Sequence, residues 1–189
     1  MEILNYDEVM IRKMDIIESI VMGSVFIHPT DTIYGLGCNA QNAAPVNKIR
    51  RLKGRANNPF SVIAPSPGWI LENCIITKDA QEWLKKIPGP YTLILKLKNK
   101  NCVAKEVNSG LGTLGVRIPS HWIKDVVAES KVPIVTTSVN RTQQSFMTSL
   151  EDLDVSIKSG IDFVVYEGMK EGRPSRIIDL TGKMKFIER

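Results

Sequence analysis

Short apolar runs, each followed directly by turn-forming or polar residues, recur along this 189-residue chain. Such runs suit buried strands, because Gly, Pro, Asn and Thr end them before a helix of ordinary length can form. Segments with helical spacing separate some of the runs, but they do not follow every run, as a regular βαβ series would require. The sequence therefore predicts an α/β protein with a mixed sheet and helices packed around it. The expected strands are residues 24–28, 60–64, 92–97, 114–118, 133–137, 163–166, 176–180 and 184–187, and the expected helices are residues 7–22, 42–53, 77–86 and 122–130, with a further helix opening at Ser149.

Length and composition limit the classes of protein to which the chain can belong. With 189 residues, of which 43% are hydrophobic, one domain covering residues 1–189 is expected. We expect a cytoplasmic protein, because no apolar run approaches the ~20 residues of a membrane helix and the first residues lack the apolar part of a signal peptide. Three separated cysteines and two histidines predict neither a disulfide framework nor a protein-held metal site. The net charge of +5 suggests an anionic partner, either phosphates or nucleic acid.

Residues 29–37, PTDTIYGLG, place polar and flexible residues directly after an apolar strand. Thr30, Asp31 and Thr32 can bond either the local backbone or a ligand. The two glycines of the segment allow the backbone to approach a ligand closely. A polar turn whose glycines serve packing explains the same residues, so the local sequence leaves both interpretations open.

A dense run of cations, KIRRLKGR, ends the expected helix 42–53. Such runs usually form a solvated face, and helical spacing turns part of this one to solvent. The cations at the helix end have a second use as a phosphate site, with Lys as a point charge and Arg as a bidentate fork. The local sequence does not decide between these two roles.

Arg117 is a charged residue inside the otherwise apolar segment LGVRIP. Its burial requires a partner, which is either a structural Asp or Glu or the carboxylate of a ligand. Hydroxyl and amide groups also follow the expected strand 133–137, where Thr136, Ser138 and Asn140 suit directed hydrogen bonds or an ordinary polar turn. Neither histidine has an evident nucleophile beside it. These clusters therefore indicate binding and orientation of an anionic substrate, not covalent catalysis.

Taken together, these segments resemble the YrdC-like family, the threonylcarbamoyl-AMP synthases. The resemblance implies an open, twisted α/β fold with a concave, basic cavity. It also implies a nucleotidyltransferase that makes threonylcarbamoyl-AMP and pyrophosphate from L-threonine, bicarbonate and ATP. A separate transferase complex would then move the threonylcarbamoyl group to the tRNA adenosine beside the anticodon. The matching segments, in the family's order, are residues 29–37, 53–55 with 58–59, 88–92, 113–119, 138–140 and 174–180.

The resemblance further implies roles for single residues. Lys53 and Arg55 are expected to be the catalytic cations, because fixed positive charge stabilises the charge that develops at the α-phosphate and on pyrophosphate. Magnesium is expected to arrive with ATP, without a dedicated protein site. The positions that hold L-threonine are matched by Thr32, Arg117, Thr136 and Ser175. The nucleotide-binding positions are matched by Lys53, Arg55, Asn58, Thr113, Ser138, Asn140, Ser145 and Arg189. The remaining cations of the run, Lys48, Arg50 and Arg51, are expected to form a solvated helix face.

Two rival functions fit parts of the same sequence. The related carbamoyl-adenylate domain of hydrogenase maturation proteins usually lies inside a much longer chain. An RNA-binding module of the same fold, without synthase activity, would also use a basic cavity, and weak RNA binding is compatible with the charge. Single-strand sites, however, usually expose stacking aromatics, whereas 6% of residues here are aromatic and none interrupts the cationic run. The synthase is therefore the favoured prediction.

Overall fold

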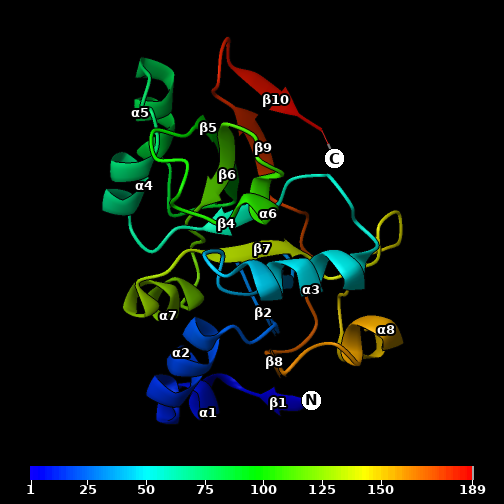
Figure 1. Ribbon diagram of the computed structural model, residues 1–189. Helices are drawn as coiled ribbons and strands as arrows, with labels where there is room; N and C mark the ends of the chain where they lie inside the picture. Colours follow the sequence, from blue (N-terminus) through cyan, green and yellow to red (C-terminus); the bar gives the residue numbers. More distant parts are fainter. Residues whose placement is uncertain (189) are drawn as a thin grey trace.

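The computed structural model describes residues 1–188, and a mixed sheet of ten strands within those residues forms its centre (Figure 1). The strands are β1 (Glu2–Leu4), β2 (Phe26–His28), β3 (Gly35–Gly37), β4 (Ser61–Ile63), β5 (Tyr91–Lys96), β6 (Thr113–Arg117), β7 (Ile134–Ser138), β8 (Phe163–Val165), β9 (Arg176–Asp179) and β10 (Lys185–Ile187). Their order across the sheet is β1-β8-β2-β3-β7-β4-β6-β5-β9-β10. Parallel pairs such as β4 with β6 and antiparallel pairs such as β2 with β3 both occur. Figure 1 shows the edge strands β1 and β10 at opposite ends of the molecule.

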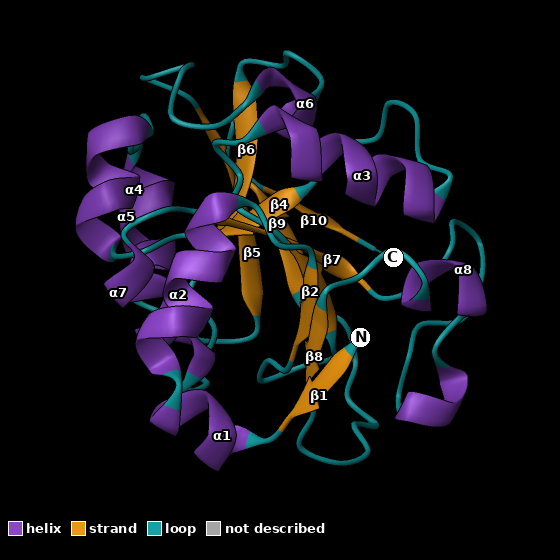
Figure 2. Ribbon diagram, turned by 60° about the horizontal axis from the view of Figure 1, so that its bottom comes forward, coloured by secondary structure: helices purple, strands orange, loops and turns teal. Residues whose placement is uncertain are grey.

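Helices lie on both sides of this sheet, with α1 and α2 to the left of the strands and α3 and α8 to the right in Figure 2. They are α1 (Tyr6–Ile11), α2 (Lys13–Met22), α3 (Ala43–Lys53), α4 (Pro67–Asn73), α5 (Lys78–Leu84), α6 (Lys105–Asn108), α7 (Ile123–Ser130) and α8 (Val155–Lys158), with a 3₁₀ turn at Leu150–Asp152. Within residues 1–188 no helix is long and apolar enough to cross a membrane.

The two faces of the sheet are covered by different elements. Side chains alternate between the faces along each strand, so each face has its own set of residues. On one face, apolar residues such as Val62, Leu93 and Val135 form a core with helices α3, α4, α5, α6 and α8. The opposite face is divided into two parts. One part, which includes Ile63 and Ile134, packs against α1, α2 and α7. The other part is open and forms the floor of the candidate site.

The predicted mixed α/β sheet with surrounding helices is confirmed, and the differences lie in single elements. The expected helix 7–22 is two helices, because Arg12 leaves the helical conformation (φ −103°, ψ 23°) and its guanidinium bonds Glu2 of β1 at 2.5 Å. The capping box at Ser149 opens only the 3₁₀ turn. Helix α4 was not predicted; in the structure Ser66 caps it and Pro67 lies in its first turn.

Candidate active site

A cavity of about 710 Å³ lies over the open part of the sheet. Three small or polar residues on neighbouring strands form its floor. The strand register places them side by side, since Ser61 of β4 pairs with Gly115 of β6 on one side and with Thr136 of β7 on the other. These small residues leave room where larger ones would fill the face. The walls come from the turn 30–35, the loop 55–60, β5 and the segment 175–188. The volume is in the range of ~300–1,000 Å³ that small-molecule sites occupy.

Most of the predicted site residues meet at this cavity. Asn140 does not line it, but its side-chain oxygen accepts a hydrogen bond from Ser138 Oγ at 2.6 Å. Ser145 lies exposed on the loop after β7 and is not among the lining residues. Arg189 lies outside the described residues. The predicted residues that line the cavity are Thr32, Arg55, Asn58, Thr113, Arg117, Thr136, Ser138 and Ser175.

The turn between β2 and β3 holds the guanidinium of Arg117. Asp31 forms an ion pair with Nη2 of Arg117, and the two side chains are 11% and 5% exposed. The other carboxylate oxygen of Asp31 accepts the N–H of Ser120 at 2.9 Å. Thr32 Oγ1 lies 3.3 Å from Nη1 of Arg117. Of the two partners predicted for Arg117, the structure therefore shows the structural carboxylate, and Arg117 also lines the cavity.

The two glycines after this turn make room for a buried histidine. A Cβ at Gly35 would lie 2.7 Å from Cε1 of His28, and a Cβ at Gly37 would lie 2.8 Å from the carbonyl oxygen of Val135. Gly35 lines the cavity, whereas Gly37 does not belong to its described lining. The expectation that both glycines open the backbone to a ligand is corrected accordingly. Burial lowers the pKa of His28 to about 4, so the imidazole is neutral at pH 7.

Lys53 is not among the residues that line the cavity, and its contact with phosphates stays a prediction. The side chain is buried at the end of α3, and its Nζ donates to the carbonyl oxygens of Ser138 at 2.5 Å and Asn140 at 2.7 Å and to Asn140 Oδ1 at 3.0 Å. Burial, with a smaller contribution from the Arg55 guanidinium, lowers its pKa to about 7. These bonds use all three hydrogens of the ammonium. Lys53 thus fastens the end of β7 to α3 and positions residues that line the cavity.

Arg55 is placed as predicted, in the lining of the cavity. It belongs to the loop 54–60, where its Nη2 donates to the carbonyl oxygen of Pro59 at 2.7 Å and its Nε to that of Asn58 at 3.2 Å. The guanidinium also lies 5.1 Å from the centre of the Phe60 ring. The loop therefore carries Arg55 and Asn58 to the cavity as one bonded unit.

Arg50 contradicts the expectation of a solvated helix face. Its guanidinium donates to several backbone carbonyls, including those of Glu106 at 2.6 Å and Ala56 at 3.0 Å. Burial lowers its pKa. Arg51 is exposed, and Lys48 lies 3.5 Å from the carboxylate of Asp162. The expected solvated helix face therefore fits Arg51 and Lys48. Helical periodicity gives the direction of a side chain but does not show which distant backbone it meets.

Several lining residues were missed by sequence analysis. Thr92 Oγ1 lies 2.8 Å from Ser175 Oγ, and the pair is buried. Thr92 lies at the end of the matching segment 88–92, but it begins an apolar run that reads as a strand, and no role was assigned to it. Asp179 and Glu188 also line the cavity. The charged groups of the described lining are thus two carboxylates and the two arginines, which is less basic than expected.

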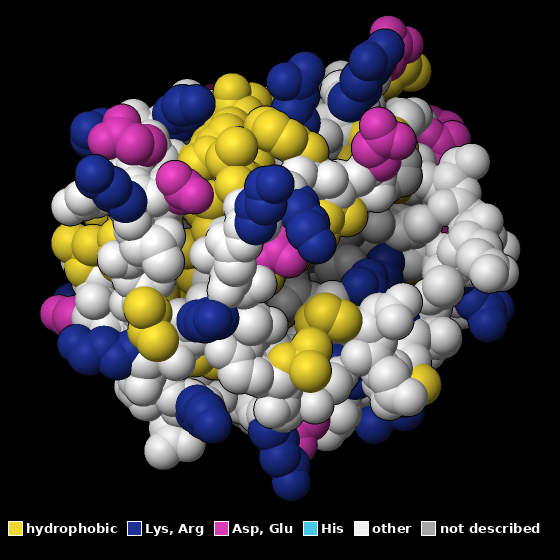
Figure 3. Space-filling model, turned by 90° about the horizontal axis from the view of Figure 1, so that it is seen from above, with side chains coloured by type: hydrophobic (Ala, Val, Ile, Leu, Met, Phe, Trp, Pro, Cys, Tyr) yellow, Lys and Arg dark blue, Asp and Glu magenta, His cyan; other side chains and the backbone are white. Residues whose placement is uncertain are grey.

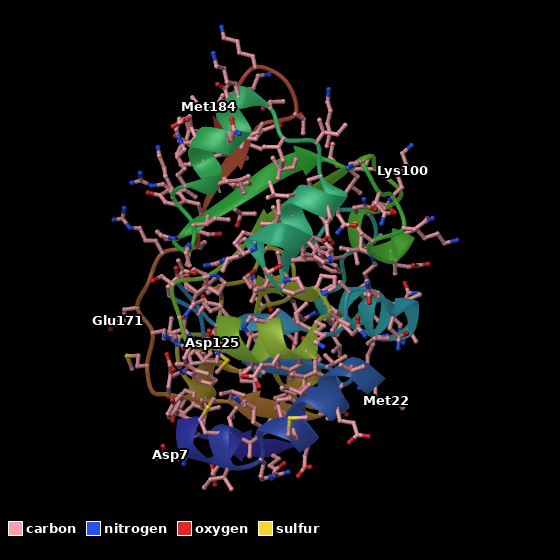
Figure 4. All side chains as sticks on the ribbon, turned by 90° about the vertical axis from the view of Figure 1, so that its left-hand side faces the viewer. Asp7, Met22, Lys100, Asp125, Glu171 and Met184 are labelled. Carbon is pink, nitrogen blue, oxygen red and sulfur yellow. The ribbon has the colours of Figure 1, made fainter. Side chains whose placement is uncertain are left out.

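The segment 166–175, which joins β8 to β9, packs against the turn 30–35 and brings Ser175 to the cavity; we call it the closing segment. Figure 4 shows it at the edge of the molecule, where Glu171 is labelled. The hydroxyl of Tyr34, a lining residue, donates to the carbonyl of Gly168 at 2.6 Å and accepts the N–H of Glu167 at 3.1 Å. Gly172 lies so close to Thr32 that a Cβ would fall 1.9 Å from the carbonyl oxygen. This closing segment therefore requires a glycine at position 172.

The carboxylate of Glu167 anchors the same segment from outside. It accepts bonds from Lys170 Nζ at 2.5 Å, His121 Nε2 at 3.0 Å and Trp122 Nε1 at 3.1 Å. Burial alone would raise the pKa of Glu167, but the bonds from Lys170, His121 and Trp122 outweigh it and lower the pKa. The ionised carboxylate is therefore the form that holds the segment.

The family model designated Sua5/YciO/YrdC, described as "Telomere recombination", matches residues 18–189. The chain belongs to this family. A relative from Methanocaldococcus jannaschii is 32% identical over 169 residues, which cover 86% of this chain and 77% of the relative. The family's threonylcarbamoyl-AMP synthase from Bacillus subtilis is 34% identical over 149 residues, which cover 73% of this chain. The match covers only 42% of the Bacillus subtilis protein.

The fold matches a solved structure of the family. The crystal structure of Pyrococcus abyssi Sua5 complexed with L-threonine superimposes with a TM-score of 0.86 at 28% identity. The match covers 99% of this chain and 56% of that one. The open α/β fold that the resemblance implied is thereby confirmed.

Proposed function

We propose that this protein is an L-threonylcarbamoyladenylate synthase, which forms threonylcarbamoyl-AMP and pyrophosphate from L-threonine, bicarbonate and ATP. The observation that carries the proposal is the convergence of Thr32, Arg117 and Ser175 with Arg55 and Asn58 on one cavity. Family membership, a relative named threonylcarbamoyl-AMP synthase and a structural neighbour complexed with L-threonine support it. The activity, substrates and partners are proposed because the chain spans less than half of that named relative.

At the amino-acid end of the cavity, Arg117 binds the threonine carboxylate by a charge-assisted bond. Thr32, Thr136 and Ser175 surround the same region and orient the substrate through hydroxyl groups. Orientation is the main requirement, because the threonine amine then forms a carbamate, either by adding to carbon dioxide with loss of a proton or by reacting with bicarbonate with loss of water. Asp31 keeps the guanidinium of Arg117 in place while it does so.

At the nucleotide end, a carbamate oxygen attacks the α-phosphorus, and the bond to the β-phosphate oxygen breaks to release pyrophosphate. Arg55 stabilises the charge that builds on the phosphates, since a fixed cation in a partly dry site needs no reorganisation. Asn58, Thr113 and Ser138 bind the nucleotide from the cavity wall. The reaction forms no bond to the protein, which agrees with two histidines that lie outside the described lining.

Magnesium is proposed to enter with the triphosphate and to neutralise part of its charge. The described residues include no group of three or more His, Cys, Asp or Glu that suits a metal. Mg²⁺ usually keeps several waters and binds phosphate oxygens, so this donor set fits an ion held by ATP.

The product would pass to a separate transferase complex for modification of tRNA, and we expect this step in the cytoplasm. The alternative, an RNA-binding module without synthase activity, is not favoured. On the face seen in Figure 3, Lys and Arg side chains are interspersed with Asp and Glu, which differs from a continuous basic surface. Weak RNA binding stays a proposal beside the synthase activity.

The test is pyrophosphate release with each substrate omitted in turn. We expect release to require ATP, L-threonine and bicarbonate together, and we expect threonylcarbamoyl-AMP in the complete mixture by mass spectrometry. Equal release without L-threonine would contradict the proposed function. Binding of RNA with no release in any mixture would favour the alternative.

A further inference from the structure

Arg50 lies outside the cavity, yet its guanidinium contacts the loop that carries two cavity residues. The side chain leaves α3 into a shallow recess that Ala56 and Asn57 also line. Its Nη1 donates to three backbone carbonyls of the loop 54–60. These acceptors are the carbonyl oxygens of Arg55 at 3.2 Å, Ala56 at 3.0 Å and Asn58 at 3.2 Å.

The other edge of the same guanidinium is fixed to the end of α6. Nε and Nη2 donate to the carbonyl oxygen of Glu106 at 2.8 Å and 2.6 Å, and Nη2 lies 3.2 Å from Ser109 Oγ. Ser109 in turn donates to the carbonyl oxygen of Asn57 at 2.6 Å. The guanidinium also lies 4.6 Å from the centre of the Phe60 ring. Arg50 thus joins α3, α6 and the loop 54–60 through one planar group.

The direction of the loop carbonyls matters for an anionic ligand. In a trans peptide the C=O and N–H groups point in opposite directions. Arg50 holds the negative ends of three loop peptides, and Arg55 itself bonds the carbonyl oxygens of Asn58 and Pro59. A loop carbonyl released from these guanidinium groups is free to turn toward the ligand, where its oxygen would repel a phosphate.

We propose that Arg50 is a positioning residue for the nucleotide part of the site, which it serves by holding the loop 54–60 in a phosphate-receptive conformation. The inference rests on the proposed function, because it names ATP as the ligand whose phosphates meet this loop. A lysine is a poor substitute, since a single ammonium cannot hold the loop and α6 together as a fork does.

The experiment compares Arg50→Ala and Arg50→Lys with Arg51→Ala, the exposed neighbour on the same helix. Pyrophosphate release gives kcat and KM for ATP and for L-threonine, and amide hydrogen exchange reports on residues 54–60. For Arg50→Ala we expect kcat/KM for ATP to fall on the order of 10- to 100-fold, because a displaced loop misplaces its cation. The KM for L-threonine should change less than about twofold, and exchange should rise in residues 54–60 but not in β4 or β7. Arg50→Lys should be intermediate, and Arg51→Ala should match the wild type.

Unchanged ATP kinetics and unchanged exchange in Arg50→Ala would overturn the proposal. Equal losses for ATP and L-threonine, with faster exchange throughout the sheet, would also overturn it and assign Arg50 to stability alone. If Arg50→Ala does not fold, Arg50→Lys decides by the same two measurements. If the wild type releases no threonine-dependent pyrophosphate, the proposed function fails. The role of Arg50 is then tested by amide hydrogen exchange of residues 54–60 alone. Faster exchange of residues 54–60 then supports its hold on the loop, and unchanged exchange refutes it.

Discussion

The divided face of the sheet offers a comparison within single strands. On β7, Ile134 lies under the helices α1, α2 and α7, whereas Thr136, two residues further on, lies in the cavity. On β4, Ile63 is covered and Ser61 is open. Both members of each pair point to the same face, because they are two residues apart. The covered half therefore carries large apolar groups, and the open half carries small or polar ones.

This difference shows how one sheet supplies both stability and a binding site. In the covered half, burial of apolar surface against helices stabilises the fold. In the open half, the small residues bury less apolar surface and contribute less stability. They leave a cavity floor on which a ligand can lie. The change of residue type along a strand marks the boundary between the two roles, and substitutions on each side should have separable effects.

Filling the open half should have the largest effect. A Cβ at Gly115 would lie 2.6 Å from Ser61 Oγ and 3.4 Å from Thr92 Cγ2, so Gly115→Val places a branched group on the cavity floor. We expect kcat/KM to fall by at least about 100-fold, because a substrate lifted by about 1 Å loses its alignment. The Ser61 hydroxyl can rotate, but Ser61 Cβ, 3.2 Å from the new Cβ, cannot, so the urea midpoint should fall as well. The kinetics are therefore measured at a temperature where the variant is fully folded. Wild-type kinetics in this variant would show that the floor is not the binding surface.

Weakening the covered half should reduce stability instead of activity. Ile134 is 1% exposed, and Ile134→Thr removes apolar volume and buries a hydroxyl group. We expect the free energy of unfolding to fall by about 3 kcal/mol, measured by urea denaturation, while KM values for ATP and L-threonine stay unchanged. A selective loss of substrate affinity at unchanged stability would break the comparison.

A smaller effect is expected at the boundary, where Asp31 pairs with Arg117. Asp31→Asn keeps the size of the side chain but removes its charge, so the guanidinium is held less firmly. We expect apparent affinity for L-threonine to fall about tenfold, equivalent to about 1.4 kcal/mol, with ATP affinity unchanged. The control is Asp125→Asn on α7, whose side chain is 65% exposed and which is labelled in Figure 4. Equal losses for both substrates would instead indicate general damage to the site.

The smallest effect concerns the closing segment and depends on pH. The pKa of Glu167 is lowered in the folded protein, so its stabilisation is present above the ordinary pKa of 4.5 and is lost as pH falls below it. At pH 7 we expect Glu167→Gln to lower the free energy of unfolding by at most about 1 kcal/mol. Below pH 4.5 the difference should shrink, and the two proteins should converge once the pH lies below the lowered pKa of Glu167. A difference that grows as the pH falls would contradict the assigned sign.

The sequence predicted the positions of the site better than the contacts within it. Thr32, Arg55, Arg117 and Ser175 line the cavity as predicted, because each belongs to a motif whose order along the chain matches the family. Lys53 belongs to the same set of motifs, but it binds the backbone carbonyls of Ser138 and Asn140. A motif identifies a neighbourhood, whereas the atoms that a side chain reaches depend on the path of the neighbouring loop.

The sequence by itself determined which side chains of β4 and β7 share a face of the sheet, since a period of two is a property of the extended chain. It likewise determined the capped helix α3, which begins after Asn42 and ends at Gly54 in a left-handed conformation. Only the tertiary structure decided the different roles of Arg50 and Arg51. The two are adjacent and chemically identical, and helical geometry alone sends both away from the core. Arg50 holds α6 and the loop 54–60 together because these segments, which lie later in the chain, bring their carbonyl oxygens within hydrogen-bond distance of its guanidinium.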